Sequence, residues 1–143
     1  MNRREALFAT GALIAAGAAA AAEEHSHHHH SGAHPWQAVL DTAGICIEKG
    51  EICLTHCIML LGEGDKTMAA CATSVREMLA SCRALITLAG AESKFAPKLA
   101  ALCVDVCKNC EAECKKHATK HTPCKECMDS CAECAKACQA MIG

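Results

Sequence analysis

The sequence predicts an all-α fold, specifically an antiparallel up-down-up-down four-helix bundle with a cysteine-lined core. Four segments carry apolar residues at helical spacing, and short turns containing Gly, Asp, Ser or Pro separate them. The fourteen cysteines recur mostly at intervals of three and four residues, which places them on single helix faces. No segment shows the alternation typical of a strand, and short connections between helices favour antiparallel neighbours.

The first two predicted helices are separated by a glycine-containing turn. Pro35-Trp36 opens the first helix, which we expect to reach Leu61. The sequence Gly62-Glu63-Gly64 then interrupts the pattern, because glycine is unfavourable within a helix. Asp65 is a suitable N-cap residue for a second helix that ends near Ala89.

The last two predicted helices both begin with a capping residue and a proline. Ser93 is the expected N-cap of the third helix, with Pro97 in its first turn, and this helix is predicted to reach about Thr119. The dipeptide Thr122-Pro123 then provides an N-cap and a proline at the first helical position. The fourth helix is expected to end near Ile142.

The chain before the bundle divides into two parts by composition. Residues 1–22 combine Arg3-Arg4 with an apolar stretch and a small-residue cleavage site, as in a twin-arginine export signal. The apolar stretch is short for a membrane span, so no membrane association is expected after signal removal. Residues 23–34 are rich in histidine and expected to be disordered. The bundle domain spans residues 35–143, and the predicted location is periplasmic or otherwise extracytoplasmic.

Each predicted helix carries its cysteines as a stripe along one face. At ~100° per residue, the stripe of the third helix falls within an arc of roughly 60°, and that of the fourth within roughly 80°. Aromatic residues make up only 2% of the chain, so bound metal is expected to fill the interior. The candidate metal ligands, in helix order, are Cys46, Cys53 and Cys57; Cys71 and Cys82; Cys103, Cys107, Cys110 and Cys114; and Cys124, Cys127, Cys131, Cys134 and Cys138.

Charge balance favours Cu(I) in such a core. Buried thiolates need their charge cancelled, because an isolated ion in a low-dielectric interior is very costly. Zinc in a four-cysteine site leaves a net charge of about −2 and requires tetrahedral ligands. One Cu(I) per thiolate is electrically neutral, and Cu(I) prefers soft sulfur. We therefore expect multiple Cu(I) ions, roughly one per core cysteine, bridged by thiolates.

Other interpretations of the cysteines remain open. Pairs such as Cys107-x-x-Cys110 could bind zinc, and a general thiol-rich buffer for zinc or cadmium is an alternative function. An iron–sulfur cluster needs four converging thiols, usually from loops. Export and an even number of cysteines also permit a disulfide-stapled interaction module. Thiols three or four residues apart on one helix are nevertheless poorly placed to bridge each other.

The antiparallel topology sorts sulfur and imidazole groups to one end of the bundle. The opposite end is predicted to form an apolar plug of Leu85, Ile86, Leu88, Phe95, Leu99 and Leu102. The ligand-rich end, where metal should enter, collects His56, Cys57, Met59, Met68, Cys71, Cys114, His117, His121, Cys124 and Met128.

Not every histidine and methionine near the sulfur stripes is predicted to bind metal. His56 and Met68 are the candidate non-cysteine ligands, and they would help to admit and release ions. Solvated residues at helix ends are the expectation for His117 and His121, where a histidine is favourable near a helix C-terminus. Packing or surface roles are expected for Met59, Met78 and Met128.

Composition also limits the classes of partner. The formal net charge of −2 gives no reason to expect a nucleic acid or an anionic membrane. No acid–base pair or substrate pocket stands out, so the chain is not predicted to be an enzyme. Apolar residues at outer positions of the first helix leave surface that another subunit could cover, namely Ile45, Ile47, Ile52 and Ile58.

Two short motifs resemble those of the exported bacterial copper storage proteins. They are Cys53-Leu54-Thr55-His56-Cys57 and Met68-Ala69-Ala70-Cys71, and the similarity extends over essentially the whole mature chain. The resemblance implies a homotetramer of four-helix bundles that stores Cu(I) for copper enzymes, with entry at the end carrying His and Met. The client enzyme is not visible in the sequence.

The chain departs from the family pattern near this entrance. Leu60 and Glu63 replace additional methionines of the family, Met59 is one position out of register, and Cys103 adds a thiol.

Overall fold

The computed structural model describes residues 34–143, and within them every regular element is helical. The predicted export signal lies in residues 1–33, outside the described part, as does all of the His-rich segment except His34. The elements are α1 (Gln37–Gly62), the 3-10 turn η1 (Lys66–Met68), α2 (Ala69–Gly90), α3 (Ala96–Lys115) and α4 (Thr122–Ile142).

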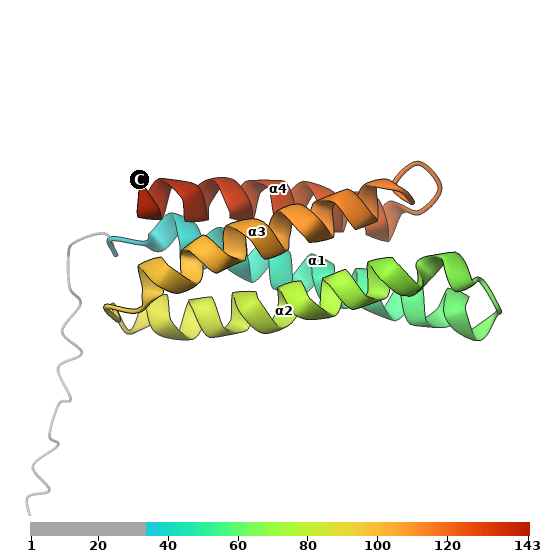
Figure 1. Ribbon diagram of the computed structural model, residues 1–143, viewed down its shortest axis with the longest axis horizontal. Helices are drawn as coiled ribbons and strands as arrows, with labels where there is room; N and C mark the ends of the chain where they lie inside the picture. Colours follow the sequence, from blue (N-terminus) through green and yellow to red (C-terminus); the bar gives the residue numbers. More distant parts are fainter. Residues whose placement is uncertain (1–33) are drawn as a thin grey trace, which may run out of the picture. The chain divides into compact units, whose positions relative to one another are not determined.

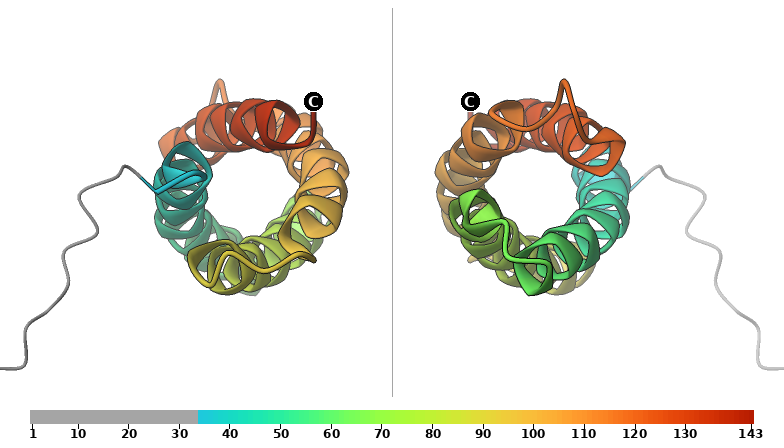
Figure 2. Two further views of the ribbon diagram at one scale, coloured as in Figure 1. Left: turned by 90° about the vertical axis from the view of Figure 1, so that its left-hand side faces the viewer. Right: turned by 90° about the vertical axis from the view of Figure 1, so that its right-hand side faces the viewer.

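The four helices form an antiparallel ring, which confirms the predicted bundle. Each helix packs against the next in sequence, and α4 closes the ring on α1. Figure 1 shows successive helices running in opposite directions, and Figure 2 shows the ring along its axis. The α1–α2 and α3–α4 turns therefore share one end, here called the mouth, while the α2–α3 turn and the C-terminus share the other, the closed end.

The turn between α1 and α2 is stabilised by the predicted cap. The Asp65 carboxylate accepts hydrogen bonds from the Thr67 backbone N–H at 3.0 Å and from its hydroxyl at 2.6 Å. Gly64 precedes it with φ of 96°, a left-handed conformation that glycine adopts without steric cost. One turn of 3-10 helix then leads into α2, so the cap acts a few residues before the α-helix itself.

The turn between α3 and α4 differs from the prediction in two respects. α3 ends at Lys115, not near Thr119, because the following N–H groups bond to carbonyls three residues back, as His117 does to Cys114 at 3.0 Å. Thr122 is already the first residue of α4. His121 takes the N-cap position in an extended conformation, and no side chain caps the helix.

Cysteine dominates the core, with all fourteen thiols buried. The closed end is less apolar than predicted, since Phe95 and Leu102 are 59% and 52% exposed. Phe95 precedes α3, and its ring centroid lies 5.2 Å from Lys94 Nζ. Leu102 faces outward because its neighbour in α3, Cys103, faces the core. Leu85 remains buried there, as do Ala89, Ala96 and Ala100.

None of the helices in residues 34–143 has an apolar stretch long enough to cross a membrane.

Two glycines of α1 provide a test of how tightly this core is packed. A Cβ at Gly44 would meet nothing within 4 Å, so Gly44→Ala should stabilise the protein by about 0.5–1 kcal/mol. A Cβ at Gly50 would lie 2.5 Å from Met78 Cε and 2.9 Å from Leu79 Cδ2. Overpacking of about 1–3 kcal/mol should then outweigh the helix gain in Gly50→Ala. Urea unfolding of the metal-free variants measures the change in the free energy of unfolding for each substitution. Equal stabilisation by the two substitutions would contradict the close contact of position 50 with Met78 and Leu79.

Candidate metal centre

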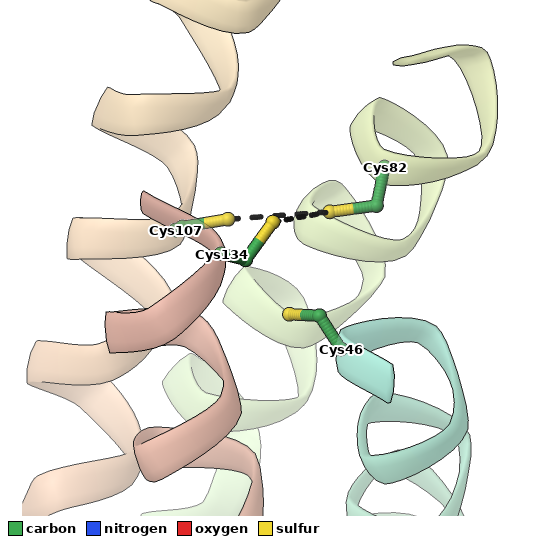
Figure 3. Close-up of side chains that lie close together, drawn as sticks. All are labelled: Cys46, Cys82, Cys107 and Cys134. Atoms are coloured by element: carbon green, nitrogen blue, oxygen red, sulfur yellow. Dashed lines mark hydrogen bonds between the residues drawn. The ribbon is translucent and has the colours of Figure 1, made fainter. Parts of the chain in front are cut away.

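Sulfur atoms from all four helices meet along the bundle axis. Figure 3 shows one such level, where Cys46 of α1, Cys82 of α2, Cys107 of α3 and Cys134 of α4 point toward one another. Their four Sγ atoms lie within 4.8 Å of each other. Cys82 Sγ is 4.0 Å from Cys107 Sγ and 3.9 Å from Cys134 Sγ. The helical spacing of the cysteines thus produces converging thiols, as predicted.

Further thiol groups continue this arrangement toward the mouth, and they share members. Cys53 belongs to two groups, and so does Cys127. Neighbouring thiols of different helices are close, with Sγ–Sγ distances of 3.6 Å for Cys71–Cys114 and 3.7 Å for Cys57–Cys71. The remaining groups are Cys110, Cys127 and Cys131; Cys53, Cys114 and Cys127; and Cys53, Cys57, Cys71 and Cys124. We call this continuous series of buried thiols the sulfur column.

All fourteen cysteines are free thiols in this structure. The shortest cysteine pairs, Cys46–Cys131 and Cys71–Cys114, have Sγ atoms 3.6 Å apart. A disulfide requires about 2.05 Å between its sulfur atoms. The described structure therefore contains none of the disulfides that the cysteine count permitted. Only Cys103 and Cys138, near the closed end, lie outside the compact thiol groups.

Hydrogen bonds between thiols divide the column into more acidic and less acidic members. A hydrogen bond from Cys107 lowers the pKa of Cys134 to about 5, so this group favours the thiolate. The pKa of Cys53 is raised, first by its hydrogen bond with Cys114 and further by burial. Ionising the whole column without cations would place many negative charges in a dry core, which is energetically prohibitive. The empty column is consequently held partly protonated.

A histidine pair lies at the mouth. His56 Nε2 is 3.0 Å from His121 Nδ1, although 65 residues separate them in sequence. The His117 ring follows, with its centroid 6.5 Å from that of His121. His121 is therefore not simply a solvated helix-end residue. The feature of the sequence that indicates its contact with His56 is that both residues are predicted to lie at the ligand-rich end of the bundle. Met68 is fully buried nearby, at the start of α2.

Two other methionines have contrasting surroundings. Met59 is 59% exposed, in keeping with a predicted surface position. Met78 is fully buried, and its Sδ lies 3.3 Å from Cys46 Sγ. A packing role is the prediction from sequence for Met78, although it shares a helix face with Cys71 and Cys82.

Comparison with known proteins assigns this site to a family. Residues 32–143 match the family model described as copper storage protein, which covers the whole bundle. The chain belongs to the copper storage protein family. A related protein of Bacillus subtilis (strain 168), named uncharacterized cysteine-rich protein YhjQ, is 29% identical over 105 residues. That alignment covers 73% of this chain and 94% of the relative.

Solved structures of the family share the architecture. Apo-Csp3 (copper storage protein 3) from Bacillus subtilis superimposes with a TM-score of 0.66 at 28% identity, covering 75% of this chain and 98% of that one. Cu(I)-bound copper storage protein BsCsp3 gives a TM-score of 0.67 at 26% identity, covering 75% and 97%.

Complete burial of the thiols predicts how they react. In the folded, metal-free protein under anaerobic conditions, an aromatic disulfide reagent should modify the cysteines slowly, since every Sγ is shielded from solvent. After unfolding in denaturant, all fourteen should react. Absorbance of the released thiolate gives both counts. A total well below the number of cysteines without prior reduction would show that disulfides form instead.

Proposed function

We propose that this protein stores Cu(I) in the sulfur column, binding about one ion per core cysteine. The sharing of Cys53 and of Cys127 between adjacent thiol groups is the observation that carries the proposal. A shared thiolate can bridge two Cu(I) ions, and one Cu(I) per thiolate leaves the column electrically neutral. Closed, independent metal sites would not share their ligands in this way.

The proposed ligands are the cysteines of the column, with two further groups at the mouth. His56 and Met68 would help to admit and release ions there, and the contact of His56 with His121 adds a second imidazole at this entrance. The cysteine ligands are Cys46, Cys53, Cys57, Cys71, Cys82, Cys103, Cys107, Cys110, Cys114, Cys124, Cys127, Cys131, Cys134 and Cys138.

Storage of zinc is the second candidate, supported by the two groups that contain four thiols. Cys46, Cys82, Cys107 and Cys134 form one of them, and four sulfur ligands are what a structural zinc site requires. Each group would hold a single zinc ion and retain a net charge of about −2. This alternative therefore predicts a capacity of about two ions, far fewer than the Cu(I) proposal.

The cellular context proposed for this store follows from the sequence. Residues 1–22 would act as a twin-arginine signal that exports the chain to the periplasm, and the His-rich residues 23–34 would precede the bundle domain. The stored copper would supply copper enzymes, and the protein itself would have no catalytic activity. Homotetramer formation would cover exposed isoleucines of α1, of which Ile45 and Ile58 are 52% and 58% exposed.

An anaerobic titration distinguishes the copper and zinc proposals. Cu(I) is added to the reduced protein in competition with a chromophoric chelator, after the free thiols have been counted. We expect an endpoint near one Cu(I) per cysteine, unchanged by excess zinc, because thiolates bind Cu(I) far more tightly than Zn²⁺. An endpoint of about two ions, or displacement by zinc, would reject the Cu(I) store.

Filling the column should also release protons. The pKa values of Cys53, Cys82 and Cys131 are raised, each chiefly by a hydrogen bond with a neighbouring thiol, so these groups are protonated near neutral pH. Each must lose its proton to bind Cu(I), and affinity should therefore fall as pH falls. A pH indicator in weakly buffered solution measures the release, and chelator competition at two pH values measures the affinity. Loading without proton release would contradict the protonated state of the empty column.

A further inference from the structure

We propose that Met78 is a metal ligand inside the sulfur column, where its thioether binds a Cu(I) ion held by Cys46. This inference rests on the proposed function and adds a neutral sulfur ligand to the thiolates. The Met78 side chain is fully buried, and its Sδ lies 3.3 Å from Cys46 Sγ. This sulfur–sulfur distance is shorter than the 3.6 Å between Cys46 Sγ and Cys131 Sγ.

The position of Met78 fills a gap in the sulfur stripe of α2. This helix contributes only Cys71 and Cys82 to the column, and their spacing of eleven positions corresponds to roughly 16 Å of helix. Met78 lies four residues before Cys82 and seven after Cys71, which places it on the same face. Met78 thus adds a sulfur atom to the core-facing side of α2 between its two cysteines.

The facing helix provides space for the thioether. Gly50 lies four residues after Cys46 on α1, and a Cβ there would approach Met78 Cε to 2.5 Å. The methyl group of Met78 therefore rests against the bare backbone of α1, while its sulfur lies beside Cys46. A larger residue at position 50 would push the side chain away from this contact.

The polar groups around Met78 do not provide it with another function. Ser74, one turn earlier on α2, donates its hydroxyl hydrogen to the Cys71 carbonyl oxygen at 2.9 Å. Its hydrogen bond is thus already made within the helix. The Cys46 thiol is the polar neighbour for which the structure records a contact with Met78 Sδ.

Thioether chemistry suits this level of the column. A thioether is soft and uncharged, so it binds Cu(I) without adding negative charge to the core. Cu(I) with the Cys46 thiolate and Met78 is electrically neutral as a unit. An unbranched methionine with three rotatable bonds can also adjust its sulfur position as the ion enters.

Selenium absorption spectroscopy tests this assignment directly. The protein is prepared with selenomethionine and Met68→Leu, which removes the proposed methionine ligand at the mouth, and is then loaded with Cu(I). We expect a copper shell at bonding distance in the selenium K-edge spectrum. That shell should be lost in Met68→Leu/Met78→Leu and retained in the matched control Met68→Leu/Met59→Leu, since Met59 is 59% exposed.

Each outcome distinguishes this inference from the storage proposal. Normal Cu(I) loading of the Met68→Leu protein without a copper–selenium shell would overturn the role of Met78 and leave storage intact. Failure of the wild-type protein to load many Cu(I) ions would overturn both. Leu and Met are similar in volume, so the variants should fold. Absence of the shell in the Met68→Leu spectrum overturns the role of Met78 even where the double variant does not fold.

Discussion

The need to neutralise thiolate charge in a dry core is the constraint on which the rest of this structure depends. Fourteen cysteines are buried at the centre of four helices, where water cannot solvate their ionised forms. Without metal, thiols share protons through hydrogen bonds such as that between Cys82 and Cys134. With one monovalent cation for each thiolate, the same core is neutral. The bundle is therefore organised around exchange of protons for soft cations, and its packing is secondary to that exchange.

This constraint also explains the unusual core composition. A bundle of this size would normally bury Leu, Ile and aromatic side chains, yet here Leu79 and Leu85 are the only leucines buried in the described chain. Cysteine is small and packs as a weak hydrophobe, so the helices approach each other without large interlocking side chains. Bound metal adds attraction between helices only when the protein is loaded, which couples stability to copper content.

Much of the fold and sulfur column could be predicted, because helical periodicity fixes which side chains share a face. Once Cys107 and Cys134 face inward, their neighbours on the stripes must do so as well. The errors arose where periodicity gives no information. Phe95 lies before α3, outside any helical face, and the end of α3 depends on local backbone hydrogen bonds. The contact between Met78 and Cys46 depends on the absent side chain of Gly50, a packing relation between two helices that no single helix reveals.

The two ends of the bundle give the column a direction. At the mouth, His56 and His121 place imidazole groups above the first thiols, and both side chains are partly exposed. At the closed end, Leu85 is buried, while Cys103 and Cys138 lie outside the compact groups. Under the proposed function, ions entering at the mouth would pass between groups through the shared thiolates of Cys53 and Cys127. Each transfer then replaces one sulfur ligand at a time, so an ion need not be released into the low-dielectric core. The ligand sharing proposed for dense storage would thus also provide a route along which ions move among the three groups linked by Cys53 and Cys127.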